Sequence, residues 1–167
     1  MIENRKMTKK EQTDYIVELV KIDIKNHMKK EELRETLKVI FDTELKRNAT
    51  NEELAKAIID GCKGRKTYYL KIYEMWKYSY FGVSLSRVEE LFNINRYKRK
   101  QLETYGLLDT AYTYEVRAYG TYLNVPVYTL ESVFRLLGED LDELLKEKRR
   151  LEKARMNKKD IDNKDDV

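Results

Sequence analysis

The chain has 167 residues, of which 41% are hydrophobic and 38% are charged, and its formal net charge is +4. This length suits one ordinary domain or two small ones, and the apolar content is enough for a folded core under a heavily solvated surface. A single cysteine excludes an internal disulfide, and no apolar run reaches the roughly 18 residues of a membrane span, so we expect a cytoplasmic protein.

The positive charge is concentrated in one part of the chain. Residues 61–100 carry ten basic and three acidic side chains, whereas residues 1–60 and 135–167 are each balanced. A concentrated positive field favours contact with the phosphates of nucleic acid. A solvated basic face without a ligand is the alternative. The richness in Lys, Asn, Ile and Tyr is typical of an AT-rich genome, such as that of a bacterium or its phage.

Residues 1–61 predict a helical module whose first 12 residues are polar and expected to fray. Thr50 opens a Thr-Asn-Glu-Glu capping box, which marks a helix start. Gly61 and Gly64 end that helix and form the expected hinge to a second module. Helical spacing of apolar residues predicts three helices in this module, over 13–28, Lys30–Phe41 and Asn51–Asp60.

The second and third of these helices resemble SAP and Rho N-terminal-like modules. They are joined by the extended segment DTELKRNAT, and Glu53-Leu54 opens the third helix as in that family. Lys46 and Arg47 in this segment, beside a helix N-terminus, are candidate phosphate contacts. A generic helical hairpin is the alternative. Three further cations after the third helix are secondary candidates for phosphates, namely Lys63, Arg65 and Lys66.

Residues 62–82 predict a linker helix that is dense in aromatic side chains. We expect its ring-bearing face to pack on the second module. The aromatic residues of this segment are Tyr68, Tyr69, Tyr73, Trp76, Tyr78, Tyr80 and Phe81.

The segment Val83–Asp109 predicts a helix-turn-helix. Its helices are expected at Ser84–Phe92 and Asn95–Tyr105, with Gly106 as the C-cap. The second helix opens with a basic and aromatic run, which suits a recognition helix in the major groove of DNA. The candidate DNA-binding residues of this run are Asn95, Arg96, Tyr97, Lys98, Arg99 and Lys100.

These side chains are assigned different tasks by their chemistry. Arg96 can bind guanine and Asn95 adenine in a bidentate manner, because both lie at the end of the helix that meets base edges. Lys98, Arg99 and Lys100 suit phosphates, which set orientation without reading sequence. We expect Arg96, Arg99 and Lys100 to be exposed. A charged helix on a protein-binding surface is the alternative.

Residues Tyr112–Tyr128 alternate as in a β-hairpin that turns near Gly120–Asn124, with Pro126 on an edge strand. Arg117 and Tyr119 on this hairpin are candidate contacts to the DNA backbone or minor groove. Twelve of the 13 tyrosines lie between residues 68 and 128, and core packing is the other role open to them.

Thr129 is expected to cap one long helix that runs to about Met156, followed by a disordered tail at 157–167. The helix before Leu141 is expected to close the core. Beyond it, the helix extends into solvent, pairs with a second copy as a homodimer, or lies along a phosphate backbone. The apolar positions of the predicted stripe are Leu130, Val133, Phe134, Leu137, Leu141, Leu144, Leu145 and Leu151.

The region after residue 82 resembles two families of DNA-binding proteins. Ser84–Asp109 resembles the start of MerR-type regulators, in which the second helix ends in a Glu-x-x-Gly-Leu-Leu-like sequence. Here Glu103-Thr104-Tyr105-Gly106-Leu107-Leu108 occupies that position. The layout from Val83 to Lys159, with Val127-Tyr128 ahead of the charged helix Leu130–Arg155, is similar to the DNA-binding domain of the xeroderma group A repair protein. Both resemblances imply a winged helix-turn-helix. The chain has no evident effector domain and no four-cysteine zinc site, so neither family activity carries over.

Catalytic signals are weak. His27 has no metal-ligand partner at helical spacing, and Cys62 near Lys63 and Arg65 lacks a supported base. No phosphate-binding glycine loop or nucleophile elbow is present. We therefore predict no enzyme activity, no cofactor and no metal.

Together these patterns predict a mainly α (α+β) protein. Its expected parts are a helical module at 1–61, an aromatic linker helix at 62–82, a winged helix-turn-helix module at 83–156 and a tail at 157–167. The predicted function is binding of double-stranded DNA as a small regulator or accessory factor. The alternative is an inhibitor or adaptor that docks on a host protein through its aromatic and basic surface.

Overall fold

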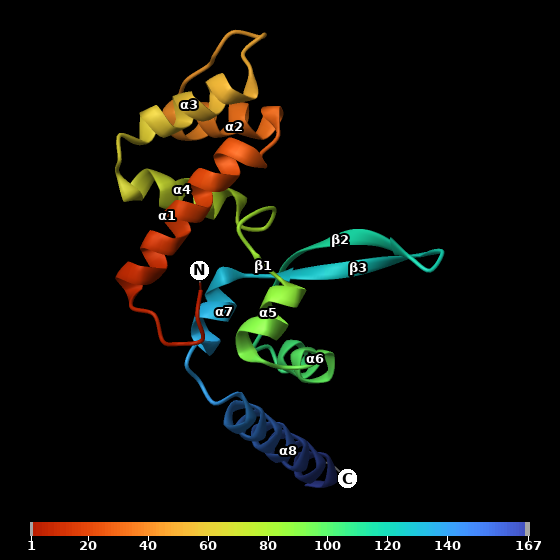
Figure 1. Ribbon diagram of the computed structural model, residues 1–167. Coiled ribbons are helices and arrows are strands. Elements are labelled where there is room, and N and C mark those ends of the chain that lie inside the picture. Colours follow the sequence, from red (N-terminus) through yellow and green to blue (C-terminus); the bar gives the residue numbers. More distant parts are fainter. Residues whose placement is uncertain (1, 166–167) are drawn as a thin grey trace.

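The computed structural model describes residues 2–165 and shows a mainly helical chain with one small antiparallel sheet, which confirms the predicted α+β class (Figure 1). Within that part of the chain, no helix is long and apolar enough to cross a membrane. In chain order the elements are α1 (Lys9–Asn26), α2 (Lys30–Phe41), α3 (Asn51–Cys62), α4 (Lys66–Trp76), β1 (Val83–Ser84), α5 (Leu85–Phe92), α6 (Arg96–Thr104), β2 (Thr110–Ala118), β3 (Thr121–Tyr128), α7 (Leu130–Leu136) and α8 (Leu141–Asp165).

Helices α1 to α4 form the helical module. Helix α1 packs along α4 and α3, and α2 packs along α3. The apolar positions that predicted these helices are buried, for example Ile24 on α1 and Leu37 on α2. The predicted cap at Thr50 is confirmed, because its hydroxyl accepts from the backbone N–H of Glu53 at 3.1 Å. Helix α1 begins earlier than predicted, since Thr8 forms a capping box at its N-terminus.

Helix α4 packs mainly along α1 and belongs to the helical module, so the expected hinge at Gly61 and Gly64 is wrong. The expected packing of its aromatic face on the second module is limited to contacts such as the hydrogen bond from Tyr73 to Glu131. Tyr69 is buried, and Trp76 Nε1 donates to Thr36 Oγ1 of α2 at 2.8 Å. The rings of α4 complete the core of α1–α3. These contacts join residues far apart in the sequence, so the aromatic pattern alone does not predict them. The connection between the modules is the segment 77–82.

Helices α5 and α6 form the predicted helix-turn-helix. Each helix starts at a side-chain cap: Ser84 Oγ accepts from Arg87 N, and Asn95 Oδ1 accepts from Lys98 N. Asn93, in the left-handed conformation at φ 49°, ends α5 and turns the chain toward α6.

The sheet has the order β1-β3-β2, and β2 and β3 form the predicted hairpin. Its turn is formed by Tyr119 and Gly120, both at positive φ, so the turn is tighter and lies earlier than predicted. Strand β3 is central, not an edge strand. Pro126 is nevertheless tolerated, because β1 pairs only with Val127 and Tyr128 and leaves the edge of β3 free beyond them.

The predicted long C-terminal helix is broken into α7 and α8. Gly138 interrupts it in the left-handed conformation at φ 72°, and Asp140 Oδ1 then accepts from the first N–H groups of α8. Residues 2–8 pack here and do not fray as expected: Asn4 Oδ1 accepts from Gly138 N at 3.0 Å, and Ile2 is buried. These contacts join opposite ends of the chain, and local composition gives no sign of them.

Helix α8 continues through Asp165, so the expected disorder from residue 157 is wrong up to that point; residues 166–167 lie outside the described residues. Its exposed part is rich in Lys, Arg and Glu, which favour helix. Ion pairs one turn apart, such as Arg150 with Glu147 at 2.7 Å, stabilise it without a core.

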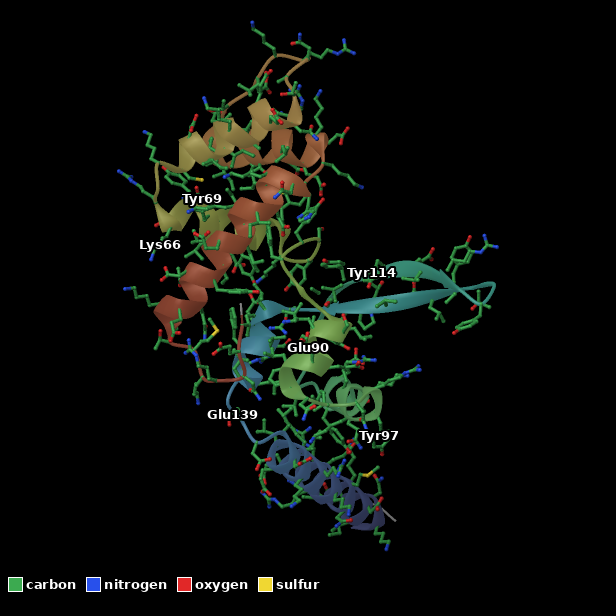
Figure 2. The ribbon with its side chains drawn as sticks, in the orientation of Figure 1. Lys66, Tyr69, Glu90, Tyr97, Tyr114 and Glu139 are labelled. Carbon is green, nitrogen blue, oxygen red and sulfur yellow. The ribbon has the colours of Figure 1, made fainter. Side chains whose placement is uncertain are left out.

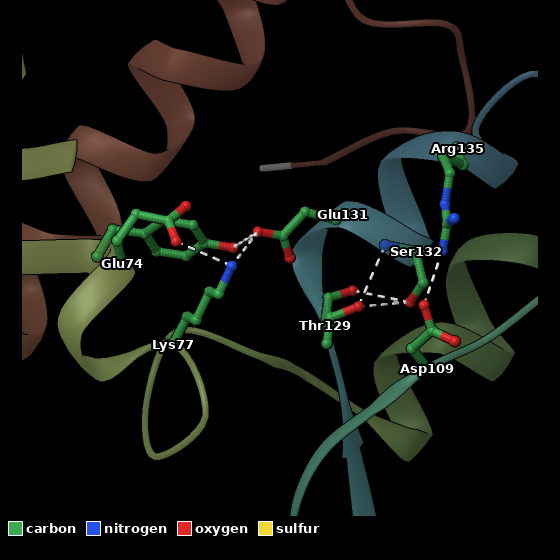
Figure 3. A network of polar contacts seen from close by, with 8 residues as sticks. Glu74, Lys77, Asp109, Thr129, Glu131, Ser132 and Arg135 are labelled. Atoms are coloured by element: carbon green, nitrogen blue, oxygen red, sulfur yellow. Dashed lines mark hydrogen bonds and ion pairs between the residues drawn. The ribbon is translucent and has the colours of Figure 1, made fainter. Parts of the chain in front are cut away.

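A polar network joins the two modules (Figure 3). Glu131, at the start of α7, accepts from the Tyr73 hydroxyl of α4 at 2.7 Å and lies 3.8 Å from Lys77 Nζ. The rings of Tyr15 and Phe134 meet edge to face at the same junction. The segments on either side of residues 77–82 are therefore tied together by side chains.

Candidate nucleic-acid interface

The solvent-facing side of α6 keeps only part of the predicted cationic cluster. Arg96 and Lys100 are exposed, and Tyr97 is 71% exposed. Gln101 lies one turn after Tyr97 and is half-buried. Among the residues that the structure describes, neither Arg96 nor Lys100 forms an ion pair. This face, which we call the α6 face, comprises Arg96, Tyr97, Lys100 and Gln101.

Arg99 is buried, and its predicted exposure is wrong. The residue is 3% exposed; its Nε donates to Glu89 of α5 at 2.9 Å, and its Nη1 donates to the Tyr128 hydroxyl of β3 at 2.5 Å. A carboxylate oxygen of Glu103, one turn further along α6, lies 3.5 Å from Arg99 Nη1. Position 99 is three residues before the buried Leu102 and therefore shares the core-facing side of the helix. Arg99 fastens α6 to α5 and β3.

Hydrogen bonds keep the Arg99 side chain charged although it is buried. Burial of Arg99 opposes its charge, but the hydrogen bonds with Glu89 and Tyr128 outweigh burial and raise its pKa. Burial also raises the pKa of Tyr128 to about 12, against the lowering effect of the Arg99 hydrogen bond. Arg99 thus stays positive and Tyr128 stays neutral as a hydrogen-bonding partner at neutral pH.

Two further residues that were predicted to contact DNA, Lys98 and Asn95, bind partners within the protein. Lys98 Nζ lies 2.6 Å from the carboxylate of Asp142 on α8, so it is not free to hold a phosphate as predicted. Asn95 Oδ1 accepts from the backbone N–H of Lys98 at 2.9 Å as the N-cap of α6. The bidentate adenine contact predicted for Asn95 needs this same oxygen, and the cap occupies it. The sequence indicates this cap, because Asn95 directly precedes the basic run and Asn is favoured at helix N-caps.

A groove of about 540 Å³ separates α6 from the free edge of β3. Arg96 and Lys100 line its α6 side, and Asn124 lines its β3 side. Tyr128 points from β3 to Arg99, so by alternation Asn124 lies on the α6 side of the hairpin base. The groove also contains Glu89 and Glu103, and Arg99, which pairs with both, offsets one of their two negative charges.

The hairpin has one polar and one apolar face. The polar face carries the cross-strand pair Arg117 and Tyr122, and the apolar face carries Val116 opposite Leu123. All four residues are exposed. Tyr119 is fully exposed at the tip, so the predicted contacts Arg117 and Tyr119 are both accessible to a ligand.

A second groove, of about 590 Å³, separates α6 from α8. Tyr97 and Gln101 line it from α6, and Lys146 and Arg149 line it from α8. Figure 2 shows Tyr97 on the side of α6 that faces α8. The position of the α8 cations beside α6 could not be predicted from the sequence, because it depends on the break at residues 137–140 that turns α8 toward α6.

The secondary phosphate candidates of the helical module lie on exposed turns. Lys46 and Arg47 are exposed, and the segment that holds them is fixed by Arg34 of α2, which donates to the carbonyls of Leu45, Lys46 and Arg47. Sequence analysis did not identify this role for Arg34. Lys63 and Arg65 are exposed as well.

Lys66 has a structural partner. It pairs with Asp14 of α1 and so ties α4 to α1, which makes it a poor phosphate contact.

The other candidate reactive side chains have local partners. His27 Nδ1 lies 2.5 Å from an Asp23 oxygen one turn back on α1. Cys62 is fully buried, and burial raises its pKa to about 11, which disfavours the nucleophilic thiolate. In residues 2–165 no group of three or more His, Cys, Asp or Glu side chains is placed to hold a metal ion.

In comparisons with known proteins, no family model matched the chain, and no curated protein or solved structure matched it either. The site is therefore interpreted from its own geometry.

Proposed function

We propose that this protein binds double-stranded DNA through the α6 face and the hairpin. One observation carries the proposal: α6 presents two exposed cations, Arg96 and Lys100, without an ion pair among the described residues, while Arg99 pairs with Glu89 inside the fold and Lys98 pairs with Asp142 on α8. The α6 face carries no acidic side chain. A short helix of this kind, next to a projecting hairpin, has the dimensions and charge that the major groove and its flanking phosphates accept (Figure 1).

The side chains of the α6 face divide into two tasks. Arg96, in the first turn of α6, can donate a bidentate pair to guanine, and Gln101 can pair in the same way with adenine. Lys100 and the hairpin Arg117 suit phosphates, which orient the protein on the duplex. Arg99 contributes indirectly, because it holds α6 at a fixed position relative to the hairpin.

The proposal is tested with the double variant Arg96→Ala/Lys100→Ala. Its affinity for a fluorescein-labelled duplex of random sequence is measured by fluorescence anisotropy. On random duplex both cations act through the phosphate backbone, and their removal is expected to weaken binding by about tenfold. Both side chains are exposed, so the folded structure is retained.

A matched control removes the same charge elsewhere. Lys25→Ala/Lys56→Ala changes two exposed cations of the helical module and is expected to keep the affinity within about twofold of wild type. Equal losses in both double variants would contradict the proposal. Wild-type protein that does not bind duplex would also overturn it, and would favour the alternative of a protein-docking role for the exposed apolar face with Val116 and Leu123.

A further inference from the structure

The middle of α8 is a basic helix without a core to pack on. Every residue from Lys146 to Lys164 is exposed. Residues 146–159 carry eight basic and two acidic side chains. Acidic residues flank this stretch on both sides, so residues 135–167 as a whole have no net charge. The packing of α8 ends at Leu145, so the surface beyond it is available to a partner.

Three of these cations lie on one face. At 100° per residue, Lys146, Arg149 and Lys153 fall within about 60° of one another around the helix and span about 10 Å along it. Lys146 and Arg149 line the groove shared with α6, so this face continues the surface that starts at Tyr97. We call Lys146, Arg149 and Lys153 the α8 stripe.

The carboxylates near the α8 stripe do not cancel its charge. Asp142 is the acidic residue in the shared groove, and the hydrogen bond from Lys98 lowers its pKa and offsets its charge. Lys146 lies 3.3 Å from Glu143, which offsets part of its charge, so the cations of the stripe without an ion pair within the described residues are Arg149 and Lys153.

We propose that the α8 stripe is a second DNA-binding surface, which contacts the phosphate backbone of the duplex beside the segment that α6 reads. This inference rests on the proposed function. A partner helix is disfavoured, because the exposed apolar residues form no continuous stripe along α8: Leu151 and Ile161 lie within about 80° around the helix but are ten residues apart, and Met156 is about 140° from each. A helical row of cations continuous with the α6 face fits phosphates instead.

Phosphate contacts have a distinct thermodynamic signature. Each one adds about 0.9 to the magnitude of the slope of log Kobs against log salt concentration for duplex DNA, independently of sequence. The variant Arg149→Ala/Lys153→Ala of the full chain is therefore expected to lower that slope by about 2 on random duplex. Alanine favours helix, so circular dichroism is expected to match wild type.

The matched control lies on the same helix. Lys148 and Arg155 are exposed cations at least 100° around α8 from Arg149 and Lys153. Lys148→Ala/Arg155→Ala removes the same residue types, one Lys and one Arg, and is expected to leave the slope within about 0.5 of wild type.

The outcomes separate the two proposals. A slope reduced by the α8 stripe variant alone supports the inference. Equal reductions in both variants, or an unchanged slope in the stripe variant, would overturn the inference while leaving DNA binding through α6 in place. Wild-type protein without duplex binding would overturn the proposed function and this inference together.

Discussion

Arg96 and Arg99 lie three residues apart on α6, yet one is a surface cation and the other is a structural side chain. The difference follows from helical geometry, because Arg99 shares the side of Leu102 and Arg96 does not. Glu89 and Glu103 make burial of Arg99 possible, since they supply the opposite charge. The composition of the basic run shows how many cations it has, but not which of them face solvent.

Replacement of Arg99 is expected to destabilise the fold, because Arg99 is a buried structural side chain and not a surface cation. Arg99→Ala leaves Glu89 and the Tyr128 hydroxyl without their partner and is expected to lower the free energy of unfolding by about 3 kcal/mol. Lys100→Ala, one residue further on, is expected to change it by less than about 0.5 kcal/mol. Urea unfolding measures both; equal values for the two variants would contradict the buried network.

The buried Tyr128 and the half-buried Tyr80 predict an alkaline limit to stability. Burial raises the pKa of Tyr128 and of Tyr80 to about 12, above the value of 10.0 for a free side chain. Their stabilising contribution is complete below pH 10 and is lost as the pH rises from about 10 to about 12, because the unfolded chain releases these protons first. Unfolding followed across this range, together with tyrosinate absorbance, tests the prediction. Free titration of all tyrosines near pH 10 in the folded protein would contradict it.

At the scale of elements, local signals located most helices but not their neighbours. The caps at Thr50, Ser84 and Asn95 follow from side chains that compete for exposed N–H groups, and each is present. The packing of α4 depends on contacts such as Trp76 with Thr36, 40 positions apart, and no local pattern encodes them. The same holds for the break between α7 and α8.

The segment between the modules is closely packed at Gly82. A Cβ at this position would lie 2.9 Å from the carbonyl oxygen of Tyr128 and would also meet the Val127 side chain. Gly82→Ala is therefore expected to lower the free energy of unfolding by about 1–3 kcal/mol through overpacking. Thermal or urea unfolding measures this loss, and wild-type stability in the variant would contradict the close approach.

Truncation tests whether the end of α8 is independent of the core. Removal of residues 156–167 deletes no buried side chain among those described and is expected to leave the free energy of unfolding within about 0.5 kcal/mol of wild type. Helicity by circular dichroism is expected to fall because helical residues are lost. A large loss of stability would show that this end contacts the fold or a second copy. The homodimer that the sequence suggested gains no apolar seam from α8.

For the whole molecule, the order of most elements could be predicted from capping, periodicity and turn residues, whereas strand β1, the break between α7 and α8 and the arrangement of α6 between the hairpin and α8 could not. That arrangement depends on the turn at Gly138, on Lys98 with Asp142 and on Arg99 with Tyr128, all of which are tertiary. It places grooves on both sides of α6, one lined by Arg96 and Lys100 and the other by Lys146 and Arg149 of α8.

Site-specific photocrosslinking tests most directly whether the α6 face lies against DNA. A benzophenone amino acid replaces Tyr97, which is 71% exposed on that face, or Tyr78, which is 62% exposed and lines the cleft between the modules. On irradiation with labelled duplex, a crosslink is expected from position 97 and none from position 78. Crosslinks of equal yield from both positions, or from position 78 alone, would contradict binding through the α6 face.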